Sequence, residues 1–152
     1  MRTLIILILI FKISQSIFGQ IATNTESSDS LNIYNNAMKI YCDSLFAKNC
    51  NFLMVEFETL TTSHLPEKIG NVEIELIEYN KLIRLISKKN SLKLIRVIPV
   101  RFEKGYFFVN ILQYCVTRKR KSFEYNLLID KGMTIKYRFN CDSNSFIFEK
   151  IE

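Results

Sequence analysis

The chain has 152 residues, of which 48% are hydrophobic and 12% aromatic, and its formal net charge is +6. This composition is typical of one globular domain and argues against an intrinsically disordered chain. Part of the positive charge comes from Arg2 and Lys12 near the N-terminus. The remaining balance is too small by itself to indicate a nucleic-acid-binding protein.

The first twenty residues have the layout of a secretory signal peptide. Arg2 gives a positive start, residues 4–11 form an unbroken apolar run, and Gly19 is a small residue suited to cleavage. The run is much shorter than the roughly 20 residues that a membrane-spanning helix needs. We therefore predict cleavage after Gly19 and an exported product, periplasmic or secreted, without a transmembrane segment. Retention of residues 1–19 would instead make them a signal anchor.

The next segments predict a flexible start and then a helix. Residues 20–30 are polar and show no periodicity, which indicates a flexible N-terminus of the mature chain. From Leu31 to Leu45, apolar residues recur at spacings of three and four, which predicts an amphipathic helix of about four turns. Residues 52–57 form an apolar run of strand length, and residues 58–70 form a polar connection that contains Pro66 and His64.

Residues 72–90 fit two patterns. Apolar residues alternate with glutamates over residues 72–76, as in a strand, whereas apolar residues at helical spacing run from Leu76 to Ile86. Glutamates at the start and Lys88 and Lys89 at the end complement a helix dipole. We predict a helix over about residues 75–89 and leave open whether residues 72–77 are strand or helix.

From Leu92 onward, the pattern predicts an antiparallel meander with strands at 92–102, 106–117, 123–129, 134–141 and 145–151. Pro99 cannot donate a backbone hydrogen bond, so the first of these strands is expected at an edge or with a bulge. The second strand is apolar on both faces and is expected to be central. In the fourth, Ile135, Tyr137 and Phe139 should face the core, and Lys136 and Arg138 should face solvent.

The expected fold is therefore α+β, a two-layer domain over residues 31–152. An antiparallel meander of about five to six strands is expected to pack against one or two helices on one face. In element order, this outline resembles the cystatin-like or NTF2-like plan, a helix cradled by a curved antiparallel sheet. Folds of this kind carry many unrelated functions, so the resemblance implies the architecture alone.

The four cysteines are Cys42, Cys50, Cys115 and Cys141. Disulfides are favoured by export, but the thiols can equally remain free and buried. A continuous helix would separate Cys42 from Cys50 by about 12 Å, so this bridge requires the helix to end early and the chain to turn back. In a simple meander, Cys115 and Cys141 would lie two strands apart, at about 9–10 Å, which is too far for a disulfide. If any bridge forms, we expect Cys42–Cys50.

Motifs for catalysis or cofactor binding are missing from the sequence. A single histidine and no Cys-x-x-Cys pair argue against a zinc site, and the few glycines form neither a nucleophile elbow nor a phosphate loop. We expect no cofactor, no metal and no catalytic residue. The carboxylate pairs Glu56 with Glu58 and Glu73 with Glu75 could each share a strand face for acid–base chemistry. Solvated surface charge is the simpler interpretation.

The run Arg118, Lys119, Arg120 and Lys121 is the one concentration of charge. It could contact an anionic partner such as a lipid headgroup, an acidic polymer or an acidic protein. The alternative is that these charges keep a hairpin tip solvated. Export disfavours nucleic acid as the partner.

Together, these patterns favour a small exported domain that binds a protein or an apolar small ligand and is not an enzyme. The abundance of Ile, Lys and Asn is typical of an AT-rich bacterial genome. With the signal peptide, a bacterial origin leads us to expect the domain in a bacterial envelope or outside the cell. The alternative is a small envelope hydrolase that uses the carboxylates, or His64 with Cys42 or Cys50.

Overall fold

The computed structural model describes residues 32–46, 50–120, 122–128 and 131–152. Within these ranges, two helices and eight strands form an α+β domain with one open sheet. The predicted signal peptide, its cleavage after Gly19 and the polar segment 20–30 lie outside the described residues. The elements are α2 (Ile33–Phe46), β1 (Phe52–Glu56), β2 (Lys68–Ile69), β3 (Val72–Ile77), α3 (Tyr79–Lys89), β4 (Ser91–Glu103), β5 (Tyr106–Lys119), β6 (Ser122–Leu127), β7 (Met133–Asn140) and β8 (Ser145–Ile151).

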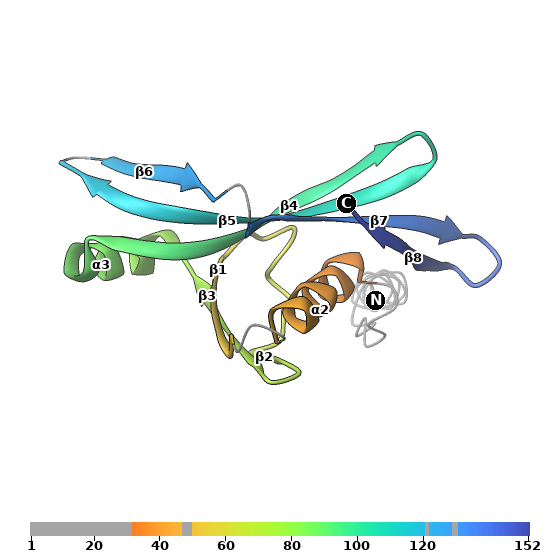
Figure 1. Cartoon of the computed structure of the whole chain (residues 1–152), viewed down its shortest axis with the longest axis horizontal. Coiled ribbons are helices and arrows are strands. Elements are labelled where there is room, and N and C mark those ends of the chain that lie inside the picture. Colours follow the sequence, from red (N-terminus) through yellow and green to blue (C-terminus); the bar gives the residue numbers. More distant parts are fainter. Residues whose placement is uncertain (1–31, 47–49, 121, 129–130) are drawn as a thin grey trace, which may run out of the picture.

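The sheet is mixed and is not a simple meander (Figure 1). Its strand order is β2-β3-β1-β4-β5-β7-β8, and β6 pairs with β5 outside this path. β1 runs parallel to both β3 and β4, and the remaining pairs are antiparallel. The prediction of an antiparallel meander is therefore wrong, because alternation identified the strands but not their partners.

The 14-residue strand β5 organises one half of the sheet. Along its edge away from β4, its first half pairs with β7, with Phe107 opposite Tyr137. Its second half pairs with β6, with Arg118 opposite Phe123. β6 and β7 therefore follow one another along the same edge of β5, so β7 does not pair with the strand that precedes it in sequence.

Several predicted elements are confirmed by the structure. α2 and β1 lie where the periodicity placed them, β5 is central and β8 is an edge strand. The strand that contains Pro99 has an irregular register between Ile98 and Arg101, which is the predicted bulge. Ile135 and Tyr137 are fully buried and Arg138 is exposed, whereas Lys136 and Phe139 are both half-buried.

The segment before α3 differs from the prediction. Residues 72–77 form a strand, so the helix predicted from residue 75 begins only at Tyr79. β3 pairs with β1 over its whole length, and this pairing buries Val72, Ile74 and Ile77. Tertiary pairing thus overrides the helical spacing that begins at Leu76. The two-residue strand β2 was also missed, in the segment predicted as a polar connection.

The two helices cover opposite faces of the sheet, and Figure 1 shows β1 and β3 passing between them. Along β4, Ile95 and Val97 pack in a core with α2, whereas Leu92 and Leu94 pack in a second core with α3. Successive side chains of a strand point to opposite faces. The two cores therefore lie on the two sides of the same strands, which differs from the predicted arrangement with the helices on one face.

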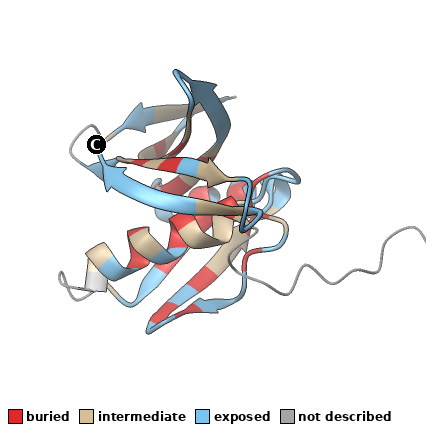
Figure 2. Cartoon of the chain, turned by 90° about the vertical axis from the view of Figure 1, so that its right-hand side faces the viewer, coloured by how far each residue is buried: buried red, intermediate tan, exposed pale blue. Residues whose placement is uncertain are grey.

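The core with α2 is the larger of the two. Figure 2 shows buried segments on the helix and on the strands around it. Fully buried Tyr137 donates a hydrogen bond from its hydroxyl to Asn36 Oδ1 at 2.9 Å, and Val100 N–H donates to the Tyr34 hydroxyl at 3.1 Å. These bonds fix α2 to β7 and β4. The core with α3 consists of Ile77, Leu82, Ile86, Leu92, Leu94 and Val116.

Candidate functional site

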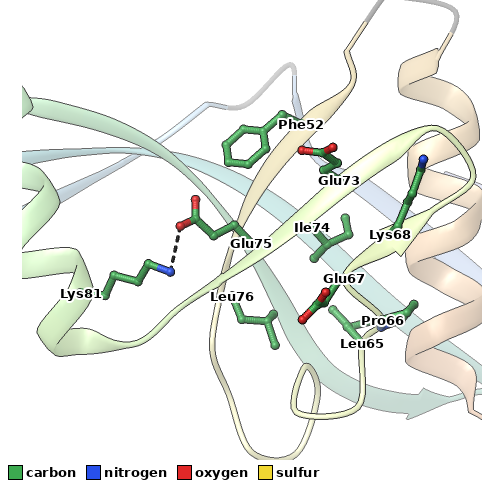
Figure 3. A pocket seen from close by; sticks show the side chains of 10 residues that line it. All are labelled: Phe52, Leu65, Pro66, Glu67, Lys68, Glu73, Ile74, Glu75, Leu76 and Lys81. Atoms are coloured by element: carbon green, nitrogen blue, oxygen red, sulfur yellow. Dashed lines mark ion pairs between the residues drawn. The ribbon is translucent and has the colours of Figure 1, made fainter.

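The edge of β3 opens into a cleft of about 630 Å³ at the point where β2 ends (Figure 3). β2 has two residues and pairs only with Val72 and Glu73. Among the described residues, no strand therefore lies beside the rest of β3 on this edge. The preceding loop, which contains Leu65 and Pro66, forms the opposite wall of the cleft.

The backbone of β3 alternates between its two edges. Glu73 N–H donates to Asn51 O on the β1 side at 2.9 Å, whereas Ile74 N–H donates to Glu67 O on the cleft side at 2.8 Å. Leu76 is the next residue whose N–H and C=O point toward the cleft. These two groups have no hydrogen-bond partner in the described part of the chain. The cleft thus exposes an unpaired piece of strand edge.

The side chains combine an apolar floor with a charged rim. Ile74 is buried and Leu76 is half-buried, and these two side chains form the floor, whereas buried Leu65 belongs to the opposite wall. Lys81 of α3 binds the carboxylate of Glu75 across the rim, at 2.8 Å between Nζ and Oε1. The other rim residues are Glu67, Lys68, Glu73 and the 43% exposed Phe52.

A buried threonine fixes the loop that leads into the cleft. The hydroxyl of Thr62, which is fully buried, donates to Glu56 O at 2.9 Å, at the end of β1. Glu58 N–H in turn donates to Thr62 Oγ1 at 2.7 Å. These two bonds attach the loop to the chain directly after the last hydrogen bonds of β1. They hold the wall formed by Leu65 and Pro66 in place.

The two predicted carboxylate pairs are both brought together, but a cation binds one member of each. Glu73 and Glu75 line the cleft, and Glu75 is bound to Lys81. Glu56 and Glu58 line a separate hollow of about 240 Å³, in which the guanidinium of Arg96 binds Glu56 through two hydrogen bonds. This arrangement favours structural ion pairs over general acid–base chemistry.

The Arg96 guanidinium also connects the strands around it. The Arg96 Cζ atom lies 5.1 Å from the centre of the Tyr114 ring and 5.0 Å from the centre of the Tyr125 ring. The hydrogen bonds to Glu56 raise the pKa of Arg96 above its usual value, so this cation stays charged. The cluster joins β1 and β4 to β5 and β6.

The structure does not join His64 to a thiol. His64 is exposed on the loop, and no hydrogen bond within the described ranges connects it to Cys42 or Cys50. Cys42 is buried in α2, and burial is the main cause that raises the pKa of its thiol to about 12. A cysteine nucleophile needs a lowered pKa, so this environment opposes cysteine catalysis.

All four cysteines are free thiols in the structure. Cys50 N–H donates to Leu45 O at 3.5 Å, so the chain does turn back beside the end of α2, and both Cys42 and Cys50 pack in the α2 core. The Cys42–Cys50 bridge stays a prediction. Cys115 pairs with β6, whereas Cys141 follows the far end of β7, so about 40 Å of strand separates them.

The basic run lies at a second groove, of about 260 Å³, between α3 and the β5–β6 hairpin. Arg118 and Arg120 line this groove, whereas Lys119 instead binds Glu124 at 2.7 Å. Lys121 lies outside the described residues. The α3 side of the groove was not predicted, because no sequence signal placed this helix beside the hairpin. The other lining residues are Tyr79, Ile83, Ser87, Ser122 and Phe123.

Among the described residues, no three His, Cys, Asp or Glu side chains gather into a group that could hold a metal ion. No described helix is both long enough and apolar enough to cross a membrane. Comparison of the chain with protein-family models, with curated proteins and with solved structures gave no match. The edge cleft and the basic groove are therefore the two features from which a function is proposed.

Proposed function

We propose that this chain is an exported, non-enzymatic binding domain whose edge cleft takes an extended segment of a partner protein. The observation that carries this proposal is the unpaired backbone of Leu76 at the edge of β3. Its backbone N–H and C=O are unpaired, and they lie at the mouth of a cleft with an apolar floor. An extended peptide gains its affinity from such backbone groups and its specificity from the side-chain positions beside them.

The cleft also suggests which segment fits. Side chains of an extended peptide alternate in direction, so one set would reach the apolar floor and the other set the charged rim. The rim holds three glutamates and two lysines, and residues 50–78 as a whole hold six glutamates and one lysine. A partner segment that alternates apolar and basic residues matches both features.

A protein segment fits this domain better than a small apolar ligand. Large side chains such as Tyr137, Met38 and Ile111 fill the space between α2 and the sheet and are fully buried there. The cleft at β3 opens to solvent along a strand edge, which suits a chain that passes through it.

Export is the second part of the proposal, and it rests on the pattern of residues 1–19. A protein recovered from a bacterial periplasm or culture medium should begin at Gln20. Intact-mass measurement decides this, since a mass that includes residues 1–19 would contradict cleavage and support a signal anchor.

The binding experiment uses fluorescence anisotropy with two labelled peptides of equal length, one alternating Lys and Val and the other alternating Glu and Val. We expect the basic peptide to bind and the acidic peptide to bind much more weakly. Leu76→Pro removes the N–H that points into the cleft and leaves the bonds to β1 in place. It should weaken binding about fivefold, the effect of one hydrogen bond of about 1 kcal/mol.

Leu76→Val is the control for Leu76→Pro, and Glu103→Lys is the control for a second test variant, Glu73→Lys. Leu76→Val keeps the N–H and should change the affinity less than twofold. Glu73→Lys should weaken binding, whereas Glu103→Lys, the same change at the exposed β4–β5 turn, should not. Equal affinity of all four variants, or equal binding of the two peptides, would contradict the proposal.

A further inference from the structure

The groove at the β5–β6 hairpin lies apart from the edge cleft and has the opposite charge. Figure 1 shows α3 and this hairpin at one end of the long axis, with the β4–β5 and β7–β8 turns at the other end. Residues 79–93 and 114–127, which form α3, the start of β4 and the hairpin, hold nine lysines and arginines and one acidic residue, Glu124. The hairpin end of the domain is therefore strongly basic.

Two guanidinium groups are available to a ligand in this groove. Arg118 and Arg120 are exposed, and no acidic side chain of the described residues lies within ion-pair distance of either. Arg118 N–H donates to Asn90 O at 3.4 Å, which brings the end of α3 beside this strand. Lys88 and Lys89 precede Asn90 and add two positive charges to this end of the domain. One guanidinium group can donate two parallel hydrogen bonds to two oxygens of the same phosphate group. A phosphate group is therefore the anionic ligand that matches these arginines.

The other half of the groove is apolar and exposed. Tyr79 is 66% exposed and Ile83 is 39% exposed, one helical turn apart on α3. The Tyr79 ring packs edge-on against Phe123 of the hairpin, with ring centres 6.2 Å apart. A basic surface beside exposed aromatic and aliphatic side chains fits the boundary between lipid headgroups and acyl chains. A soluble acidic polymer would leave Tyr79 and Ile83 without a partner.

We propose that this groove binds the phosphate of an anionic lipid headgroup and so docks the hairpin end of the domain on a membrane surface. Arg118 and Arg120 bind the headgroup phosphate, and Tyr79 and Ile83 enter the interface beside it. Surface basic residues each add about 1 kcal/mol to binding of an anionic membrane, so the cluster is large enough for reversible attachment.

The test is co-sedimentation of the chain from Gln20 to Glu152, without the apolar run of residues 4–11, with vesicles of phosphatidylcholine alone or with 30 mol% phosphatidylglycerol. We expect binding only to the anionic vesicles. The double variant Arg118→Ala/Arg120→Ala should lower the partition coefficient about 30-fold, from about 1 kcal/mol for each basic residue. The double variant Arg101→Ala/Lys104→Ala removes the same charge at the opposite end and should change it less than about twofold. Because all variants share the same N-terminus, that segment does not affect the comparison.

A third variant separates lipid from a soluble anion. Tyr79→Ser should lower vesicle binding about tenfold, from loss of part of an aromatic side chain's apolar contact, and leave binding of inorganic polyphosphate unchanged. Equal loss in the two double variants would overturn the proposal, since it would show nonspecific charge attraction. Arginine-dependent binding of polyphosphate without binding to the anionic vesicles would also overturn it.

Discussion

The two faces of the sheet are built from the same strands, but the helices cover them to different extents. On the α2 face, buried side chains from six strands form a continuous core. On the α3 face, six buried residues form a small core. The edge cleft lies between the two faces, because Ile74 and Leu76 in its floor pack in the α2 core, whereas Lys81 of α3 binds Glu75 at its rim. The basic groove lies on the α3 face, beside Tyr79.

The length of α3 explains this difference. Its 11 residues span about 16 Å, whereas the 14 residues of β5 span about 46 Å. The helix therefore cannot cover the strands on its side of the sheet. The basic groove therefore lies where a short helix leaves the sheet uncovered, whereas the edge cleft lies where the two-residue strand β2 leaves the edge of β3 unpaired, next to the α2 core.

The largest expected effect is on the α2 face. Tyr137→Ala should lower the free energy of unfolding by about 3–5 kcal/mol, because a fully buried aromatic ring is replaced by a cavity. Tyr137→Phe removes only the hydroxyl bonded to Asn36 and should cost about 1 kcal/mol. Urea denaturation measures both. Similar values for the two variants would show that the ring is not packed in the α2 core.

The small core should give a smaller effect. Ile86→Ala, at a fully buried position of α3, should cost about 2–3 kcal/mol, at the low end for such substitutions because few neighbours surround it. Ile83→Ala, at the exposed position in the same helix, should cost less than about 1 kcal/mol. The same denaturation assay applies. If Ile86→Ala costs as much as Tyr137→Ala, the two faces contribute equally and the comparison fails.

The half-buried ion pair at Arg96 should contribute less again. Arg96→Ala removes the bonds to Glu56 and the contacts with two tyrosine rings, and it should cost about 1–2 kcal/mol. Lys119→Ala removes an exposed ion pair with Glu124 and should cost about 0.5 kcal/mol or less. Chemical denaturation in low and high salt separates the two, because only the exposed pair should be sensitive to salt.

A prediction of a different kind concerns the loss of stability at moderately alkaline pH. Burial is the main cause that raises the pKa of Cys42 and of Tyr41 to about 12 in the folded chain. Both groups are neutral when protonated, and they lose their protons at lower pH in the unfolded chain. Their contribution to stability is therefore complete below about pH 9 and is lost as the pH rises toward 12. The melting temperature should fall between pH 9 and 11, and Cys42→Ala should reduce that fall. A melting temperature constant up to pH 11 would contradict this.

Periodicity predicts which face a residue occupies but not which strand lies beside it. It correctly placed Ile135 and Tyr137 in the core, and Pro99 correctly indicated a bulge. The pairing of β7 with β5 depends on contacts between residues far apart in sequence, and a local pattern does not contain them. The same limit explains the error at residues 75–78, where pairing with β1 decided between two patterns that fit equally well.

The candidate sites also contain one part that the sequence predicted and other parts that only the fold brings together. Arg118 and Arg120 stood out as a run of charge, but Tyr79 and Ser87 joined them only through the packing of α3. The edge cleft depends on β2 having only two residues, and Pro66, which cannot donate a backbone hydrogen bond, precedes this strand. The polar character of residues 58–70 gave no signal for β2 itself. The sequence therefore predicted one charged half of one site, and the fold supplied the rest.

The most direct test of the edge cleft is hydrogen exchange at the Leu76 amide, followed by NMR with and without the Lys–Val peptide. In the free protein, the Leu76 N–H should exchange fast, whereas the Glu73 N–H, which donates to Asn51 O in the β1 ladder, should be protected. Saturating peptide should protect Leu76 and leave Glu73 unchanged. Slow exchange of Leu76 in the free protein, or peptide binding that leaves its exchange fast, would contradict the proposed strand addition at β3.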